Sequence, residues 1–218
     1  MLLPVLLLNE PAAFFQGLDA SSLARGNLRL FIGGALGASA FGAAMGAHVG
    51  GSNIAATALK MPLFFALTLA LCFSLMHVVA LASGLRASAA QTLHIALSGL
   101  GVTALCLGAF APALALFAAS APTASTPSYL NLYATCALCG AIAGCFGAAR
   151  LATGLRVLHG GPARGLCCLW LFIYQFTGAQ VAWVLRPWIG GADYSLAHGL
   201  SGNFYTGAGR VLWRWLQQ

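Results

Sequence analysis

Apolar residues follow one another in five long runs along this chain, instead of alternating with polar ones. Each run reaches the roughly 20 residues that an α-helix needs to cross a bilayer. Glycine, serine, proline, asparagine or basic residues lie between the runs, as is typical of loops. The pattern predicts an all-α, polytopic membrane protein, a five-span transmembrane helix bundle. The predicted spans are about 28–49, 61–81, 93–118, 130–151 and 166–185.

Two shorter amphipathic segments flank the predicted spans. In residues 1–27, Asn9 precedes Glu10 and Pro11, residue types that favour the start of a helix. We expect this segment to lie in the membrane interface, although an ordinary packed helix explains it equally well. Residues 187–218 end in alternating tryptophan and arginine, which predicts a loop and a second interfacial helix. The membrane domain then covers residues 28–186.

The composition supports a membrane protein. Hydrophobic residues make up 60% of the chain, charged residues only 6%, and the mean hydropathy is +0.87. A soluble domain carries about a quarter charged residues. We therefore expect an integral, multi-pass protein of a bacterial inner membrane or of an organellar membrane such as the thylakoid.

The charges are predominantly basic, with ten Lys and Arg residues against three acids, Glu10, Asp19 and Asp193. The cations occur singly beside apolar runs, so they suggest contacts with lipid headgroups, and nucleic acid is not an expected partner. Five spans put more arginines on one side, which the positive-inside tendency predicts to be cytoplasmic. That side receives Arg25, Arg29, Arg86, Arg150, Arg156 and Arg164; the other receives Lys60, Arg186, Arg210 and Arg214.

Glycines recur at intervals of four in the first and fourth predicted spans. This spacing lets helix backbones approach closely in lipid. We expect close packing against other helices, either of this chain or of another transmembrane subunit. The glycines concerned are Gly33, Gly37, Gly42, Gly46, Gly140 and Gly144.

Groups for catalysis are sparse. All three acids lie outside the predicted spans, which disfavours carboxylate-coupled transport. The spacings of metallohydrolases, serine hydrolases and phosphate-binding loops are absent. Cys136 and Cys139 have C-x-x-C spacing but lack a second pair, so small apolar filling is favoured over a metal site. We expect neither an enzyme nor a metal protein.

Three histidines, His48, His77 and His94, lie in or near the first three spans. A neutral imidazole can ligate the iron of haem or the magnesium of chlorophyll. In membranes, a single histidine more often forms a hydrogen bond to a neighbouring helix. No cofactor is predicted, and chlorophyll or haem stays open as an alternative.

Polar residues gather at the end of the fifth span. On a helix, Gln175 and Arg186 share one face, and Gln180 and Trp183 lie on an adjacent one. Polar side chains at this depth mark a functional site by default. An interfacial anchor is the simpler alternative. The predicted interaction motif comprises Gln175, Gln180, Trp183, Arg186, Pro187, Asn203 and Tyr205.

These residues also carry a resemblance. The pattern F-x-G-x-Q-x-x-W-x-L-R-P-x-x-G at residues 176–190, followed by G-N-F-Y at 202–205, resembles a family of uncharacterised bacterial-type membrane proteins. The second run, M-P-L-F-F-A-L-T-L-A-L-C-F at 61–73, is similar to theirs. The layout also resembles the five-span Yip-type trafficking proteins. The resemblance implies a membrane fold but no activity, substrate or cofactor.

These observations favour a non-catalytic accessory or scaffold subunit of a larger membrane complex. Two alternatives remain at this point. One is a pigment- or haem-contacting subunit of a photosynthetic or respiratory complex, based on the histidines. The other is a transporter of small solutes or lipids, which a suitable cavity would support.

Overall fold

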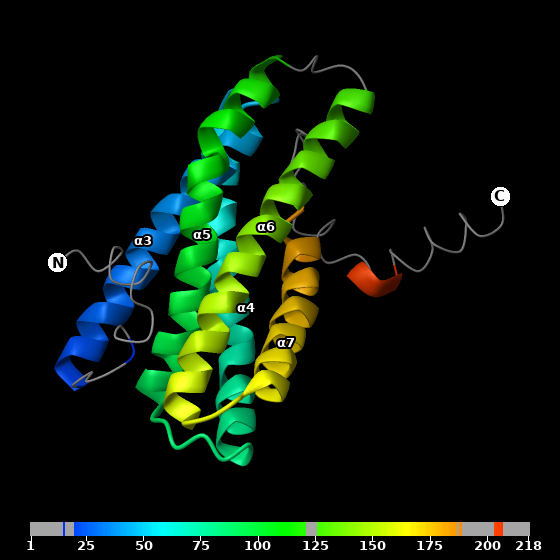
Figure 1. The fold of residues 1–218 in the computed structure, drawn as a ribbon. Helices are drawn as coiled ribbons and strands as arrows, with labels where there is room; N and C mark the ends of the chain where they lie inside the picture. The colour runs from blue at the N-terminus through cyan, green and yellow to red at the C-terminus, as the bar shows by residue number, and fades with distance from the viewer. Residues whose placement is uncertain (1–14, 16–19, 121–125, 187, 189–202, 207–218) are drawn as a thin grey trace.

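The computed structural model describes residues 15, 20–120, 126–186, 188 and 203–206. In this part of the chain the regular structure is all α-helical, and five helices are long and apolar enough to cross a membrane (Figure 1). The predicted five-span fold is therefore confirmed. The helices are α3 (Ala20–Gly46), α4 (Ser52–Ala82), α5 (Ala89–Ser120), α6 (Thr126–His159) and α7 (Arg164–Val184).

The helices extend beyond the apolar runs, and one predicted boundary is wrong. Residues 20–27 were expected in the interfacial segment, but they form the first turns of α3. Leu23 and Leu30, two turns apart on one face, are both buried, whereas Arg25 on another face is exposed. Packing of this face extends the helix toward the N-terminus. Apart from residues 20–27, the described residues of the two predicted interfacial segments are Phe15, Trp188 and residues 203–206.

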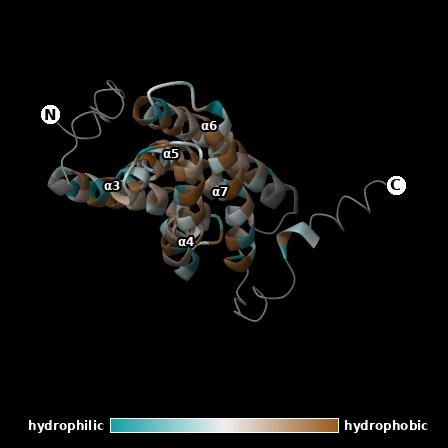
Figure 2. Cartoon of the chain, turned by 90° about the horizontal axis from the view of Figure 1, so that it is seen from below, coloured by the Kyte–Doolittle hydropathy of each residue, from teal (hydrophilic) through white to brown (hydrophobic). Residues whose placement is uncertain are grey.

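The helices are apolar on their outer faces as well as on their inner ones (Figure 2). Four leucines of the outer faces are each at least two-thirds exposed: Leu36 on α3, Leu59 and Leu71 on α4, and Leu116 on α5. A helix that is hydrophobic all round is suited to a membrane or a protein core. The outer surface of this bundle is therefore a lipid-facing surface.

The five helices are arranged as a ring. Around it, α3 packs against α4, α4 against α7, α6 against α5, and α5 against α3. The α6–α7 pair completes the ring with few contacts, and α4 and α5 barely touch each other. Figure 2 looks along the bundle and shows α4 and α6 on opposite sides, with α7 beside both. This arrangement leaves the centre of the ring to side chains.

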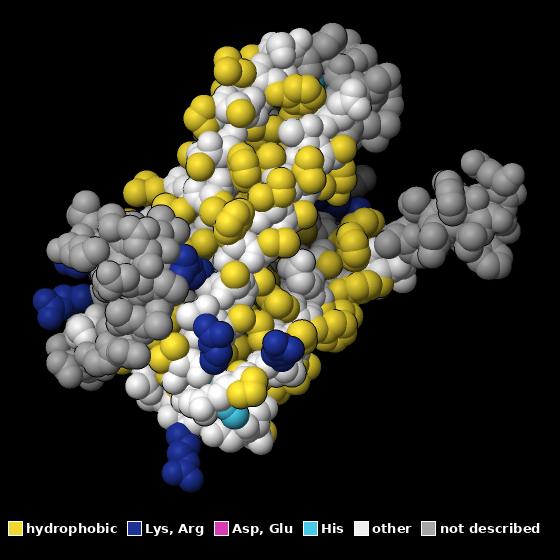
Figure 3. Space-filling model, in the orientation of Figure 1, with side chains coloured by type: hydrophobic (Ala, Val, Ile, Leu, Met, Phe, Trp, Pro, Cys, Tyr) yellow, Lys and Arg dark blue, Asp and Glu magenta, His cyan; other side chains and the backbone are white. Residues whose placement is uncertain are grey.

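Basic residues gather at one end of the bundle. The helices alternate in direction, so the start of α3, the α4–α5 loop, the end of α6 and the start of α7 meet at the lower end of Figure 1. In Figure 3 most of the visible Lys and Arg side chains lie in the lower half. We call this the arginine-rich end; its arginines are Arg25, Arg29, Arg86, Arg150, Arg156 and Arg164.

Candidate functional site

A cavity of about 720 Å³ lies within the ring and is lined by residues of all five helices. Such a volume lies within the roughly 300–1,000 Å³ of small-molecule sites. Aromatic, aliphatic and sulfur-containing side chains make up most of its wall. They include Met45 on α3, Phe64, Phe65, Leu69 and Met76 on α4, Leu100 and Leu107 on α5, Cys136 on α6, and Trp170 and Tyr174 on α7.

The cavity opens sideways between α6 and α7. Tyr133, Ala137, Ala141 and Cys145 line it, yet all four are exposed. They recur every four residues, so they form one edge along α6. Gln175 on α7 also lines the cavity and is exposed, which places it on the opposite edge. An opening between two membrane-spanning helices faces lipid.

The cavity is long. Its lining on α6 runs from Tyr133 to Leu151, which corresponds to about 27 Å at roughly 1.5 Å per residue. This length approaches the roughly 30 Å of a hydrocarbon core.

Few polar groups face this cavity, and two of its hydroxyls bind the protein itself. Thr103 Oγ1 donates to the Gly99 carbonyl at 3.1 Å, and Tyr174 Oη donates to the Phe65 carbonyl at 3.5 Å. The described residues contain no Asp or Glu. Within them, the wall therefore offers no anionic group to a cation.

Trp188, just after the end of α7, lines the cavity. Its indole Nε1 donates to the Ala182 carbonyl at 2.9 Å, and its ring meets Phe64 edge to face at a centroid distance of 5.8 Å. The hydrogen bond ties Trp188 to the end of α7, and the ring contact packs it against α4. Of the predicted interaction motif, Gln175 lines the cavity; Trp188, which the motif did not include, lines it as well.

The two distant parts of the predicted interaction motif are brought together. The Phe204 amide donates to Gln180 Oε1 at 3.4 Å, and Tyr205 Oη donates to the Phe176 carbonyl at 2.7 Å. The Tyr205 ring stacks on Phe176 with centroids 4.7 Å apart. Asn203 caps this short turn, since its Oδ1 accepts from the Thr206 amide at 2.8 Å.

Arg186 lies beside this contact. Its guanidinium carbon is 3.5 Å from the centre of the Trp183 ring, a cation–π geometry, and Trp183 also meets Phe204 edge to face. Gln180 Oε1, one turn before this pair on α7, accepts from the Phe204 amide. Pro187 lies outside the described residues. Trp183, Gln180, Asn203 and Tyr205 therefore form a fold-back contact at the outer face of α7.

The three histidines form hydrogen bonds to neighbouring helices. His94 Nδ1 lies 2.7 Å from Asn27 Oδ1, and His77 Nδ1 lies 2.9 Å from Thr92 Oγ1. His48 Nδ1 lies 3.4 Å from the Ala118 carbonyl, near the other end of the bundle. None of the three lines the cavity. Among the described residues, no three His, Cys, Asp or Glu side chains are grouped to hold a metal ion.

Three of the predicted packing glycines lie at close helix contacts. A Cβ at Gly37 would collide with the backbone of Ala104 on α5. At Gly42 and Gly46 it would collide with the backbone of α4, at Thr57 and Asn53. Glycine therefore allows α3 to approach both neighbours, as the spacing predicted.

For the other three glycines, no close helix contact exists among the residues that the structure describes. A Cβ at Gly33, Gly140 or Gly144 would have no atom within 4 Å. Gly140 and Gly144 line the cavity, so the glycine face of α6 borders the cavity instead of another helix. It is Gly147, one turn further, that meets Gly99 and Thr103 on α5. The spacing of glycines along a helix identifies the face with small residues, but it does not show whether another helix or a cavity lies opposite that face.

No protein-family model, curated protein or solved structure matches this chain. The resemblance to a membrane-protein family thus stays a prediction.

The cavity-lining aromatics Phe64, Phe65, Trp170 and Tyr174 were missed by the sequence reasoning. Their helices are apolar on every face, so periodicity carried no signal for them.

Proposed function

We propose that this chain is a non-catalytic membrane protein that binds a lipid through one of its acyl chains in the cavity between α6 and α7. The observation that carries this proposal is the sideways opening, with Tyr133, Ala141 and Cys145 on α6 facing Gln175 on α7. A lipid can move through such an opening without its chain leaving the apolar phase.

The lining favours an apolar ligand over a polar solute. Burial of a methylene group away from water contributes about 0.8 kcal/mol, whereas a polar group without a partner is costly to bury. The lining hydroxyls of Thr103 and Tyr174 bind backbone carbonyls. Methionine and cysteine side chains adapt to irregular apolar shapes. These properties support the lipid alternative over the small-solute alternative.

A transmembrane partner is the second candidate, and α6 supports it. In the most apolar 18-residue stretch of α6, 17% of the residues are buried inside the bundle, against 28–33% in the corresponding stretches of the other four spans. Leu138 and Phe146 are more than half exposed on its outer face. A partner helix would cover this outer face of an accessory subunit.

The test uses the full chain purified in a mild detergent from a membrane of known lipid composition. Lipids that remain bound are extracted and identified by mass spectrometry. Ala141→Leu puts a large side chain into the opening and should lower the bound lipid several-fold. Ala149→Leu is the matched control, since Ala149 is also exposed on α6 but does not line the cavity.

Two outcomes would overturn lipid binding. One is wild-type protein without acyl-chain lipid beyond the level on an unrelated five-span protein. The other is equal lipid on the wild type and on Ala141→Leu. A protein that copurifies with the wild type, and is lost when Leu138 and Phe146 are replaced by alanine, would support the subunit alternative instead.

A further inference from the structure

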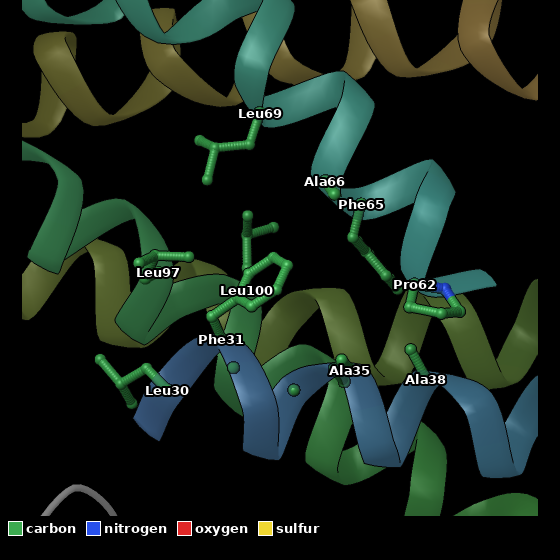
Figure 4. Close-up of a pocket in the computed structure, with 13 residues that line it drawn as sticks. Leu30, Phe31, Ala35, Ala38, Pro62, Phe65, Ala66, Leu69, Leu97 and Leu100 are labelled. Atoms are coloured by element: carbon green, nitrogen blue, oxygen red, sulfur yellow. The ribbon is translucent and has the colours of Figure 1, made fainter. Parts of the chain in front are cut away.

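A second, smaller cavity of about 40 Å³ lies between α3, α4 and α5, and it is unsuited to polar groups. Figure 4 shows it with Leu30 on α3, Pro62 on α4 and Leu97 on α5 around it. Every residue of its lining is apolar or glycine. A polar group would have no partner there, which is costly. The headgroup of a lipid bound in the large cavity must therefore lie where the large cavity ends or opens.

Two basic residues lie next to one end of the large cavity, the end farther from the arginine-rich end of the bundle. Met61 is the lining residue of α4 nearest this far end, and Ala182 is the last lining residue within α7. Lys60 adjoins Met61, and Arg186 follows Ala182 by four residues. Among the described residues, Lys60 and Arg186 are the two cations that do not belong to the arginine-rich end.

Contacts between α4 and α7 bring these two cations to the same part of the bundle. Trp188, two residues after Arg186, packs its ring edge to face on Phe64 of α4 at a centroid distance of 5.8 Å. Phe64 also faces α7, because a Cβ at Gly178 would lie 3.6 Å from its ring. Lys60 lies one turn before Phe64 on the same face of α4. Helical side chains lean toward the N-terminus of their helix, which directs Lys60 toward the end of α7.

Both cations lie at the level of a membrane interface. The 21 residues of α7 that precede Arg186 correspond to about 32 Å, and the 22 residues of α4 that follow Lys60 correspond to about 33 Å. Each cation is thus about one hydrocarbon thickness, roughly 30 Å, from the arginine-rich end. Trp183 and Trp188 flank Arg186 in the sequence, and tryptophan is typical of the headgroup layer.

The Trp183 ring orients the guanidinium of Arg186. The guanidinium carbon is 3.5 Å from the centre of that ring, so the ring covers one face of the guanidinium plane. The N–H groups of a guanidinium donate within its plane, and their fork matches two oxygens of a phosphate. Lys60 supplies a second positive charge at the same level. Directed donors and positive charge are what a phosphate group binds.

We propose that Arg186 and Lys60 bind the phosphate of an anionic phospholipid whose acyl chain occupies the large cavity. This inference rests on the proposed lipid binding and names the class of lipid. The acyl chain lies in the apolar cavity, and the phosphate lies at its far end, in the headgroup layer. The ammonium of a phosphatidylcholine headgroup would add a third positive charge there, so a headgroup with net negative charge is favoured.

The experiment places the protein in vesicles that contain phosphatidylglycerol and phosphatidylcholine with the same acyl chains, in equal amounts. The protein is then extracted in mild detergent, and the two retained lipids are quantified by mass spectrometry. We expect the wild type to retain phosphatidylglycerol over phosphatidylcholine by roughly fivefold, the effect of about one cation near a membrane surface. Arg186→Gln removes both the charge and the fork, so it should lower this ratio several-fold, and Lys60→Gln should lower it as well.

Arg156→Gln is the matched control, because it removes the same charge from an exposed residue of α6 at the arginine-rich end. We expect the wild-type ratio for this control. The extraction is also repeated with an excess of inorganic phosphate, which distinguishes a lipid headgroup from a free anion. A lipid that is held by its acyl chain as well should keep its preference in the presence of phosphate.

The outcomes separate this inference from the proposed function. A wild type that retains neither phospholipid removes the lipid proposal, and this inference with it. Equal retention of the two lipids by the wild type leaves lipid binding intact and overturns the headgroup site. The same ratio in the wild type and Arg186→Gln, an equal fall with Arg156→Gln, or loss of the preference in inorganic phosphate also overturns it. Where Arg186→Gln does not fold, a wild-type ratio in Lys60→Gln overturns the site.

Discussion

Tyr205 is the residue through which the C-terminal turn is held most closely to α7. Its hydroxyl donates to the Phe176 carbonyl at 2.7 Å, and its ring stacks on the Phe176 ring. Tyr205→Phe removes the hydrogen bond and keeps the stacking. One such bond contributes about 1 kcal/mol, so the amide of Phe204 should exchange its hydrogen roughly fivefold faster.

Hydrogen exchange followed by mass spectrometry measures this change, and Tyr205→Ala is its comparison. Alanine loses the stacking as well, so it should exchange faster than Tyr205→Phe. Equal exchange in the wild type and both variants would show that the turn is not held by Tyr205.

At the scale of single residues, the sequence predicted which polar residues belong to the interaction motif, but it did not predict the partner of each side chain. It placed Gln180, Asn203 and Tyr205 in one motif, and the structure brings them together. It did not predict that Gln180 accepts from a backbone amide, because side-chain pairing depends on a fold-back of more than twenty residues. The sequence did not predict that Leu100 lines the cavity, because a leucine within an apolar run looks the same whether it faces lipid, the core or a cavity.

At the scale of the elements, the contact between α3 and α5 depends on the absence of a side chain at Gly37. Gly37→Leu would push the Leu side chain into the backbone at Ala104. Overpacking of this kind costs typically 1–3 kcal/mol. Thermal unfolding in detergent should show a clearly lower midpoint, with no poorer insertion, since leucine suits lipid.

Gly33→Leu is the matched control on the same helix, because a Cβ there has no atom within 4 Å. We expect its unfolding midpoint to equal that of the wild type. If both variants unfold at the wild-type temperature, close approach at Gly37 does not stabilise the bundle.

The elements themselves were predictable, because about 20 apolar residues suffice to identify a span. Their ends were less so. Ser22, Arg25 and Asn27 are polar, yet they belong to α3 because Leu23 packs on the bundle. Similarly, the spacing of Gly140 and Gly144 predicted a helix contact. Which face of α6 meets α5 depends on the angle at which the two helices cross. The spacing of glycines along one helix carries no information about that angle.

At the scale of the whole molecule, the alternating helices fix which loops share a side. A cysteine at Ser88, between α4 and α5, should react from the arginine-rich side, and one at Ser52, at the start of α4, from the opposite side. Both positions are exposed. Impermeant thiol reagents on sealed vesicles of a variant without the seven native cysteines measure this. Labelling of both from one side would contradict the five-span arrangement.

The opening of the large cavity is not placed evenly across the bundle. Its exposed edge on α6 begins at Tyr133, in the half of that helix farther from the arginine-rich end, and ends at Cys145, just past the middle; Leu151, the lining residue of α6 nearest the arginine-rich end, is buried. The two leaflets of a bilayer would therefore have unequal access to it. If the cavity binds lipid as proposed and the arginine-rich end is cytoplasmic, as the positive-inside tendency predicts, that lipid would exchange mainly with the outer leaflet, and the protein would sample one monolayer of an asymmetric membrane.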